Sequence, residues 1–412
     1  MIPFEKFYLD NGLEVIVHSD HKTSIVCLNT LYKVGSRNED PNRTGFAHLF
    51  EHLMFGGSQH VENFDEPLQA VGGENNAFTN TDITNYYTTV PSNNVETAFW
   101  LESDRMLSLS FNPKVLEVQR SVVIEEYKQR YLNQPYGDAW HLLRETAYRE
   151  HPYQWPTIGK SIRHIEEATL EDVMAFFKAY YHPGNAILVI AGDITLEKAK
   201  QLTDKWYGNI PKGPEVRLNI PSEPFQKDQR KLSVHRDVPA HMIYKAYHMC
   251  GRSEEAYLSV DLMSDLMGRG KSSRLYHALV KQDAIFSSIN AFVTGSIDPG
   301  LLVIQGQLNP DIEVELANET IDRELKNFIS SVKTEELEKV KNLAASSLVF
   351  GEAELLNRAM NLAYATFLSD TAAVNQELEK IDRVTLPDIK NAYAEVIKTA
   401  NETLLYYQKE QV

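Results

Sequence analysis

The chain has 412 residues, of which 43% are hydrophobic and 24% are charged. This length is enough for two or more domains with sizeable cores, and the composition is that of an ordinary globular protein. The net charge of −16 argues against nucleic acid or an anionic membrane as a partner, and no apolar run approaches the roughly 18 residues of a membrane span. The two cysteines, Cys27 and Cys250, lie far apart, which argues against a disulfide scaffold and against a thiolate metal site.

The N-terminal sequence, Met-Ile-Pro-Phe-Glu-Lys-Phe, has no basic region followed by an apolar core. A secretory signal needs both features. The sequence therefore predicts a cytoplasmic protein, and a periplasmic location is the alternative if a signal peptide precedes residue 1.

The first half of the chain predicts strands interrupted by helices. Residues 4–34 alternate apolar and polar side chains, with a strong hairpin signal at Asn11-Gly12. A helix follows around residue 50, and Thr44 and Gly56-Gly57 are its candidate cap and stop. Further along, the patterns predict helices at 65–71, 92–109, 113–132, 136–148 and 169–181, and strands at 76–82, 84–90 and 186–191.

The helix around residue 50 carries the motif His48-Leu-Phe-Glu51-His52. Histidines at positions i and i+4 lie one turn apart on the same face of a helix, so both imidazoles can hold one zinc ion. Glu51 projects near the same place and is free to take a proton from water if a third ligand comes from elsewhere. The order H-x-x-E-H is the inverse of the commoner H-E-x-x-H and is the inverzincin signature.

A third ligand is needed, because catalytic zinc sites use three protein ligands and leave the fourth position to water. The predicted helix at 113–132 contains Val-Val-Ile followed by Glu125 and Glu126. A carboxylate after an apolar run lies either on a solvated face or beside a buried cation. The residues alone do not choose between Glu125 and Glu126.

The second half repeats the first weakly. Residues 210–230 contain four prolines among polar residues, which indicates a linker. After it, residues 242–251 resemble 26–35, and Leu266 follows Leu53 at an offset of 213 residues. The predicted domains are 1–212, which carries the metal motif, a linker at 213–230, and 231–412, of the same fold. At the same offset the motif residues fall on Asp261, Ser264 and Asp265, so the second domain is predicted to lack the metal site.

Five segments in this order resemble the pitrilysin/insulinase family of zinc peptidases, in particular its short bacterial members and the mitochondrial processing peptidase subunits. They are H-L-F-E-H-L-M-F, G-G-E-N-N-A-F-T, V-V-I-E-E-Y, H-P-Y-Q-W-P-T-I-G-K and Y-Y-H-P-G-N-A-I-L-V-I-A-G-D-I. The resemblance covers most of the first half and extends more loosely into the second through L-M-G-R-G-K-S-S-R-L-Y.

The resemblance implies that His48, His52 and Glu126 hold one zinc ion per chain, with Glu51 as general base. Members often have a further glutamate two turns before the third ligand, where this chain has Gln119. The implied fold class is α+β, with two homologous α/β domains in tandem that form half of a clamshell peptidase chamber. The G-G-E-N-N-A-F-T segment resembles the edge strand that pairs with substrate, which assigns Asn76, Ala77 and Phe78 to peptide binding.

One departure concerns an arginine and a tyrosine that active members use to bind substrate. They are expected after the S-S-R-L segment, but residues 282–287 contain neither. Arg274 and Tyr276 lie nearby, and the plain interpretation is that they pack and cap a helix. Some short members divide the work between a zinc-bearing subunit and a partner with the Arg/Tyr pair.

The sequence thus predicts a zinc metalloendopeptidase for unfolded peptides, working as a homodimer or as a heterodimer with a related subunit. The alternative is a subunit that binds zinc but is inactive by itself, either in a heterodimeric peptidase or in a structural assembly.

Overall fold

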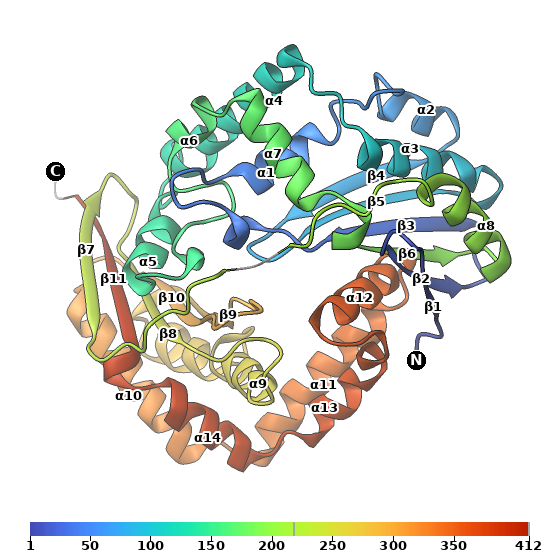
Figure 1. The fold of residues 1–412 in the computed structure, drawn as a ribbon. Coiled ribbons are helices and arrows are strands. Elements are labelled where there is room, and N and C mark those ends of the chain that lie inside the picture. The colour runs from blue at the N-terminus through green and yellow to red at the C-terminus, as the bar shows by residue number, and fades with distance from the viewer. Residues whose placement is uncertain (217–218, 411–412) are drawn as a thin grey trace. The chain divides into compact units, whose positions relative to one another are not determined.

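The computed structural model describes residues 1–216 and 219–410, and these form two compact units (Figure 1). Within the described ranges, the first unit combines Met1–Lys128, Trp155–Ile220 and Val349–Gln376, and the second combines Gln129–Gln154, Pro221–Leu348 and Glu377–Val412. Each unit is built on one mixed β-sheet with helices packed on it, which confirms the predicted α+β class. No helix of the described residues is long and apolar enough to cross a membrane.

The first unit has a six-stranded sheet in the order β1-β2-β6-β3-β5-β4. Strand β2 runs parallel to β6, and all other neighbours are antiparallel. The strands are β1 (Glu5–Tyr8), β2 (Glu14–Ser19), β3 (Ile25–Tyr32), β4 (Glu74–Thr79), β5 (Thr84–Pro91) and β6 (Ala186–Gly192). The helices are α1 (Phe46–Leu53), α2 (Asp65–Ala70), α3 (Val95–Leu107), α4 (Pro113–Tyr127), α6 (Ile162–Glu166), α7 (Leu170–Tyr180), α8 (Leu196–Tyr207) and α12 (Leu355–Leu368).

The second unit has a five-stranded sheet in the order β7-β11-β8-β10-β9. Its strands are β7 (Arg230–Arg236), β8 (Met242–His248), β9 (Phe286–Val293), β10 (Leu301–Leu308) and β11 (Glu402–Lys409). Its helices are α5 (Ala139–Ala147), α9 (Tyr257–Gly268), α10 (Val314–Ser331), α13 (Glu377–Arg383) and α14 (Leu386–Val396), and α11 (Thr334–Gly351) continues from this unit into the first.

The two sheets have the same topology apart from β1. Strands β7, β11, β8, β10 and β9 take the places of β2, β6, β3, β5 and β4, with the same parallel and antiparallel neighbours. Helix α9 follows β8 as α1 follows β3, and it contains Asp261 and Asp265, the residues at the predicted offset from the histidines. The predicted tandem of two related folds is therefore confirmed.

The structure corrects the predicted domain boundaries. The predicted domains, 1–212 and 231–412, are continuous in sequence. In the structure, however, Val349–Gln376 belongs to the first unit and Gln129–Gln154 to the second. Helix α12 comes late in the chain but packs on β6 and β3 of the first sheet, and α5 comes early but packs on β11, β8 and β7 of the second. An amphipathic pattern shows that a helix face is buried, not which sheet covers it. The predicted linker at 213–230 includes residues 217 and 218, which lie outside the described residues.

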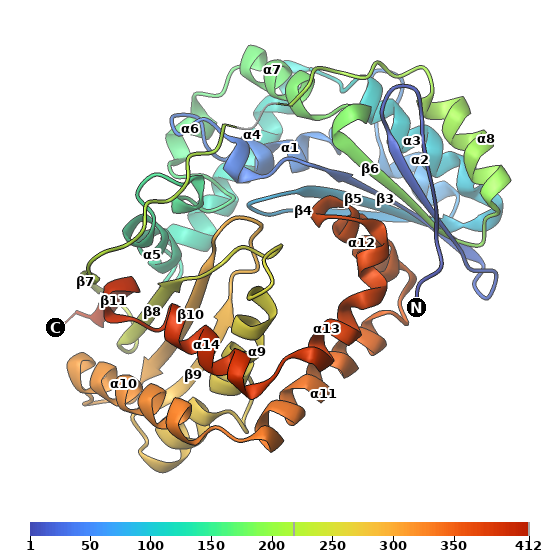
Figure 2. The same cartoon turned by 60° about the horizontal axis from the view of Figure 1, so that its bottom comes forward.

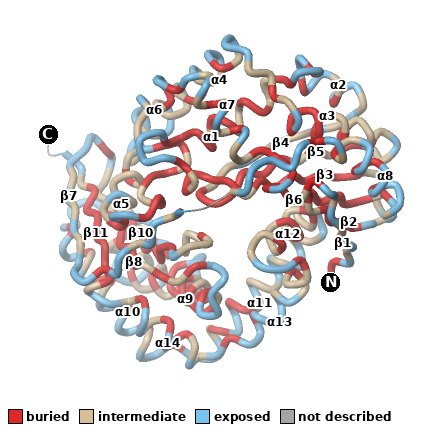
Figure 3. Tube along the Cα trace, viewed as in Figure 1, coloured by how far each residue is buried: buried red, intermediate tan, exposed pale blue. Residues whose placement is uncertain are grey.

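Both faces of the first sheet are covered. Residues of one face, such as Ile16, Leu31 and Val189, form a core with Leu355 and Leu362 of α12. Helices α3 and α8 pack on the same sheet, and every residue of β6 is buried (Figures 1 and 2). Burial is concentrated in the central strands β2, β3 and β6, whereas the edge strands β1 and β4 have no buried residue (Figure 3). The predicted buried strand at 186–191 is thus confirmed.

Candidate metal centre

Helix α1 places two histidines side by side. Its apolar residues Phe46, Leu49, Phe50 and Leu53 are buried, as the helical spacing predicts. His48 and His52 lie on the less buried face with ring centroids 4.9 Å apart and rings nearly perpendicular. The helix therefore presents two imidazoles to one side, one turn apart.

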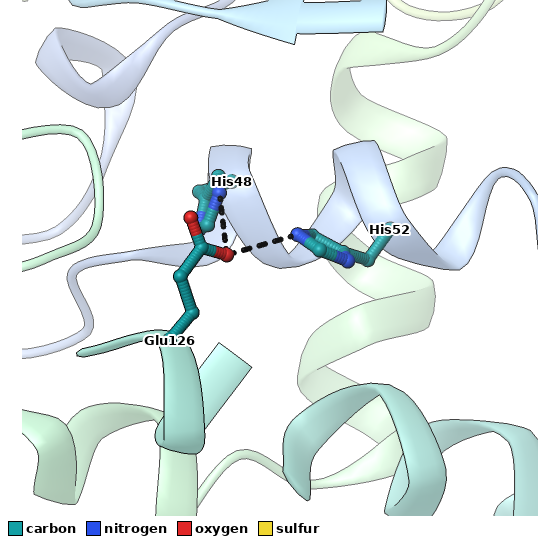
Figure 4. A group of neighbouring side chains, drawn as sticks. All are labelled: His48, His52 and Glu126. Carbon is teal, nitrogen blue, oxygen red and sulfur yellow. Dashed lines mark ion pairs between the residues drawn. The ribbon is translucent and has the colours of Figure 1, made fainter. Parts of the chain in front are cut away.

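Helix α4 contributes the third side chain. Asn112 caps this helix by accepting a hydrogen bond from the N–H of Lys114, with Pro113 in the first turn. Glu126 near its end points toward both histidines (Figure 4). One carboxylate oxygen of Glu126 lies 3.6 Å from Nε2 of His48 and 3.4 Å from Nε2 of His52.

These distances fit a zinc ion. Ligand atoms about 2.05 Å from zinc at tetrahedral angles lie about 3.3 Å apart. Among the described residues, His48, His52 and Glu126 form the one group of three histidine, cysteine or acidic side chains whose ligand atoms all lie within 4.8 Å of one another. Two imidazoles and one carboxylate form a three-ligand set of the kind found at catalytic zinc sites.

The two neighbouring glutamates, Glu125 and Glu126, lie in different surroundings. Glu125 points to solvent, with 61% of its side chain exposed, and pairs with Lys128 at 2.6 Å. Glu126 has 20% of its side chain exposed and faces the histidines. Gln119 lies two turns before Glu126 on the same helix and is half-buried.

Glu51 lies on α1 between the two histidines and is half-buried. Burial raises the pKa of this carboxyl group, the neighbouring Thr79 on β4 acts in the opposite direction, and the Glu126 carboxylate adds to the rise. Glu51 therefore lies beside His48, His52 and Glu126 without belonging to the group whose ligand atoms lie within 4.8 Å of one another.

Strand β4 forms an open edge of the first sheet, because among the described residues β5 is its one neighbour in the sheet. The backbone N–H of Ala77 donates to the side-chain oxygen of Asn76 at 2.8 Å rather than to β5, so it points away from the sheet. In an antiparallel strand the carbonyl of the same residue points the same way. Phe78 is 37% exposed on this strand, and Thr79 at its end lies next to Glu51.

A pocket of about 640 Å³ opens beyond the C-terminal end of α1. Its wall combines the aromatic ring of Phe55, three residues after His52, with polar side chains of the following loop and α2. The lining residues are Phe55, Gly56, Val61, Glu62, Asn63, Glu66 and Pro67.

The N-terminus of α1 differs from the prediction. The cap position is Gly45, with φ of +91°, and not Thr44, whose hydroxyl instead contacts His164 and accepts a hydrogen bond from the N–H of Lys160. Gly45 has no side chain to accept a helix N–H, and Glu39 does so from outside the helix. Glu39 is not among the residues that the sequence patterns indicate as functional. The one available signal is the acidic pair Glu39-Asp40 shortly before a helix that starts at glycine.

The second unit lacks the corresponding ligands. Helix α9 carries Asp261, Ser264 and Asp265 in place of the histidines and glutamate, and burial raises the pKa of both aspartates. Arg274 forms a bidentate ion pair with Glu336 of α11 and donates to the carbonyl of Ser331 at the end of α10.

Comparisons with known proteins match two different family models to the part of the chain with the histidine motif and to the part without it. Residues 14–161 match the model of the insulinase family (peptidase family M16), and residues 167–344 match the model of the peptidase M16 inactive domain. His48, Glu51, His52 and Glu126 all fall in the first range, and Asp261, Ser264 and Asp265 fall in the second.

The chain is similar to several named proteins. It is 32% identical over 363 residues to zinc protease PqqE of Helicobacter pylori, covering 84% of this chain and 82% of that protein. It is 23% identical over 404 residues to the probable mitochondrial-processing peptidase subunit beta of Arabidopsis thaliana, covering 93% of this chain and 75% of that protein.

Among solved structures, a protease from Helicobacter pylori superposes with a TM-score of 0.94 and 28% identity, over 99% of this chain and all of that one. The chain belongs to the insulinase family of peptidases, family M16, as its motifs indicate.

Proposed function

We propose that this protein is a zinc-dependent endopeptidase that hydrolyses unfolded peptides. The observation that carries the proposal is the spacing of the His48, His52 and Glu126 ligand atoms beside the open edge of β4. Relatives named zinc proteases support the same reaction class.

His48, His52 and Glu126 would hold one zinc ion per chain. When bound, zinc supplies Lewis acidity, which polarises a peptide carbonyl and makes water a stronger nucleophile near neutral pH. Glu51 would accept the proton of the attacking water and pass it to the leaving amine, which completes the hydrolysis without consuming the side chain.

The open edge of β4 would align the peptide. Extended peptides can add a strand to such an edge through main-chain hydrogen bonds, which places few demands on sequence. The outward peptide groups of Ala77 are free to pair once the Asn76 side chain turns away from the Ala77 N–H. Thr79, two residues further on, lies beside Glu51, so a peptide paired along β4 would run toward the catalytic glutamate.

Ala77→Pro is expected to raise KM about tenfold with little change in zinc content. Proline has no N–H to offer the substrate, yet it is tolerated on an edge strand where the N–H does not pair within the sheet. Steady-state kinetics on an extended peptide, with Ala77→Val as the control that keeps the N–H, measure this effect. If both variants behave like the parent chain, the peptide does not pair at Ala77.

We further propose that the active form is a dimer that encloses the peptide in a chamber. Residues 282–287 contain no arginine or tyrosine, and Arg274 is held by Glu336. A second subunit could supply such substrate-binding groups, and one relative is named as a subunit of a processing peptidase. These observations also favour the second candidate, a zinc-bearing subunit that is active only with a different partner.

The test is cleavage of a quenched fluorescent peptide mixture by the purified chain, with and without a zinc chelator, across a range of protein concentrations. Chelator-sensitive cleavage whose specific rate rises with dimer content supports a self-sufficient homodimer. A zinc-loaded chain that cleaves nothing at any concentration contradicts it and favours the heterodimer.

A further inference from the structure

The segment between β3 and α1 contacts both parts of the proposed active site. We call residues 35–39 the bracket segment. On one side it contacts the turn at 80–83, which follows β4. On the other it contacts the first turn of α1, which carries His48. All of these residues belong to the first unit.

Backbone contacts join the bracket segment to the turn. The N–H of Ser36 donates to the carbonyl of Asn80 at 3.2 Å, and the N–H of Arg37 donates to that of Thr81 at 2.9 Å. A Cβ atom at Gly35 would lie 2.5 Å from the backbone of Thr81 and Asp82, so the approach is too close for any side chain. The bracket segment therefore cannot shift without moving the end of β4.

Side chains reinforce this junction. Arg37 Nε lies 3.4 Å from a carboxylate oxygen of Asp82, and the two side chains are only 8% and 4% exposed. The side chain of Asn80 accepts hydrogen bonds from the N–H groups of Asp82 and Ile83 at 2.7 and 2.9 Å, which closes the turn. A buried ion pair and a closed turn thus join the bracket segment to the end of β4 in addition to the backbone contacts.

Glu39 makes the connection to α1. Its two carboxylate oxygens accept hydrogen bonds from the N–H groups of Gly45 and Ala47, both at 2.9 Å. These are N–H groups of the first turn, which have no partner within a helix. Ala47 directly precedes His48, so Glu39 holds the helix at the turn that carries the first proposed ligand.

Trp155 contacts the bracket segment at both Glu39 and Ser36. Its indole N–H lies 3.1 Å from the Glu39 carboxylate and 3.2 Å from the carbonyl of Ser36, and the side chain is fully buried. A buried carboxylate with three N–H donors is satisfied without a counter-cation. Burial raises the pKa of Glu39, and these three donors act in the opposite direction.

We propose that Glu39 is a positioning residue, which through the bracket segment fixes the metal-binding helix α1 in register with the β4 edge where the peptide would lie. The inference rests on the proposed peptidase function. Glu39 has this role because it links two elements with different tasks in the proposed reaction. Helix α1 carries two of the proposed zinc ligands, and β4 would align the substrate. A side chain that only capped α1 would not affect the turn after β4.

The first test does not depend on activity. Glu39→Gln replaces one acceptor oxygen by an NH₂ group that faces N–H donors, so the first turn of α1 loses a partner. Hydrogen exchange measured by mass spectrometry is expected to speed up about tenfold both at 45–47 and at 82–83, which Glu39 does not touch. Thr195→Ala, which removes the cap of α8 in the same unit, is the control and should change neither segment. Faster exchange at 45–47 alone overturns the proposal.

The second test uses kinetics and zinc content together. Glu39→Gln is expected to lower kcat about tenfold or more, with KM within about twofold and with zinc still bound, because misplaced reacting groups slow the chemical step. Trp155→Phe removes one donor to Glu39 and should act in the same direction with a smaller effect, which covers the case that Glu39→Gln does not fold. Unchanged kcat, or a loss of rate that simply follows loss of zinc, overturns the proposal. If the zinc-loaded parent chain cleaves no peptide, the proposed function fails, and hydrogen exchange still decides the role of Glu39.

Discussion

Glu51→Gln is expected to bind zinc as tightly as the parent chain and to hydrolyse peptides about 10² to 10⁴ times more slowly. Glutamine has nearly the same size but cannot accept a proton at neutral pH, and general acid–base groups contribute factors of this size. Glu51 takes no part in the group formed by His48, His52 and Glu126, so the metal should stay. Metal analysis and kcat on the same sample measure both quantities.

The matched control is Glu117→Gln on α4. Glu117 is 67% exposed and pairs with Arg120, away from the group of three ligands. Its substitution should leave kcat and zinc content unchanged. A Glu51→Gln chain that keeps even a tenth of the parent rate would show that another group moves the proton.

Glu126→Gln is expected to weaken zinc binding by more than 100-fold and to abolish cleavage at limiting zinc. Removing partners that merely orient metal ligands costs about 10- to 100-fold in affinity, so losing a ligand oxygen and its charge should cost more. Competition against a chromophoric chelator measures the affinity of the purified variant.

Glu125→Gln provides the closest comparison, because the two residues are neighbours on one helix. Glu125 faces solvent and pairs with Lys128, so its loss should change zinc affinity less than about twofold. Equal losses in the two variants would show that the effect comes from the charge or stability of α4 and not from ligation.

The sequence predicts the elements near the metal centre well, because each has a strong local signal. The spacing of apolar residues around His48 and His52 gives the helix, and Asn112 with Pro113 marks the start of α4. The prediction of strands at 76–82 and 84–90 is close to β4 and β5, which form a hairpin at the edge of the sheet. Strand β4 begins two residues and ends three residues earlier than predicted, which leaves Asn76, Ala77 and Phe78 on the strand.

The features that the sequence does not predict depend on contacts between distant segments. Thr44 is a typical cap residue, but the carboxylate of Glu39 accepts hydrogen bonds from the N–H groups at the start of α1 instead, and Trp155 donates its indole N–H to that carboxylate. Helix α12 packs on the first sheet although it comes late in the chain, and α5 packs on the second sheet although it comes early. No local sequence pattern predicts these two contacts. The choice of Glu126 over Glu125 likewise needs the geometry of two helices, or a resemblance to a known family.

The most direct measurement is a zinc titration of the metal-free chain with peptide cleavage as the readout. The account predicts no cleavage without metal, a rate that rises linearly with added zinc, and a break at one equivalent per chain. One equivalent is expected because, among the described residues, a single group can hold the ion. Cleavage by the metal-free chain, or a break at another stoichiometry, would contradict the proposal of a single zinc site at His48, His52 and Glu126.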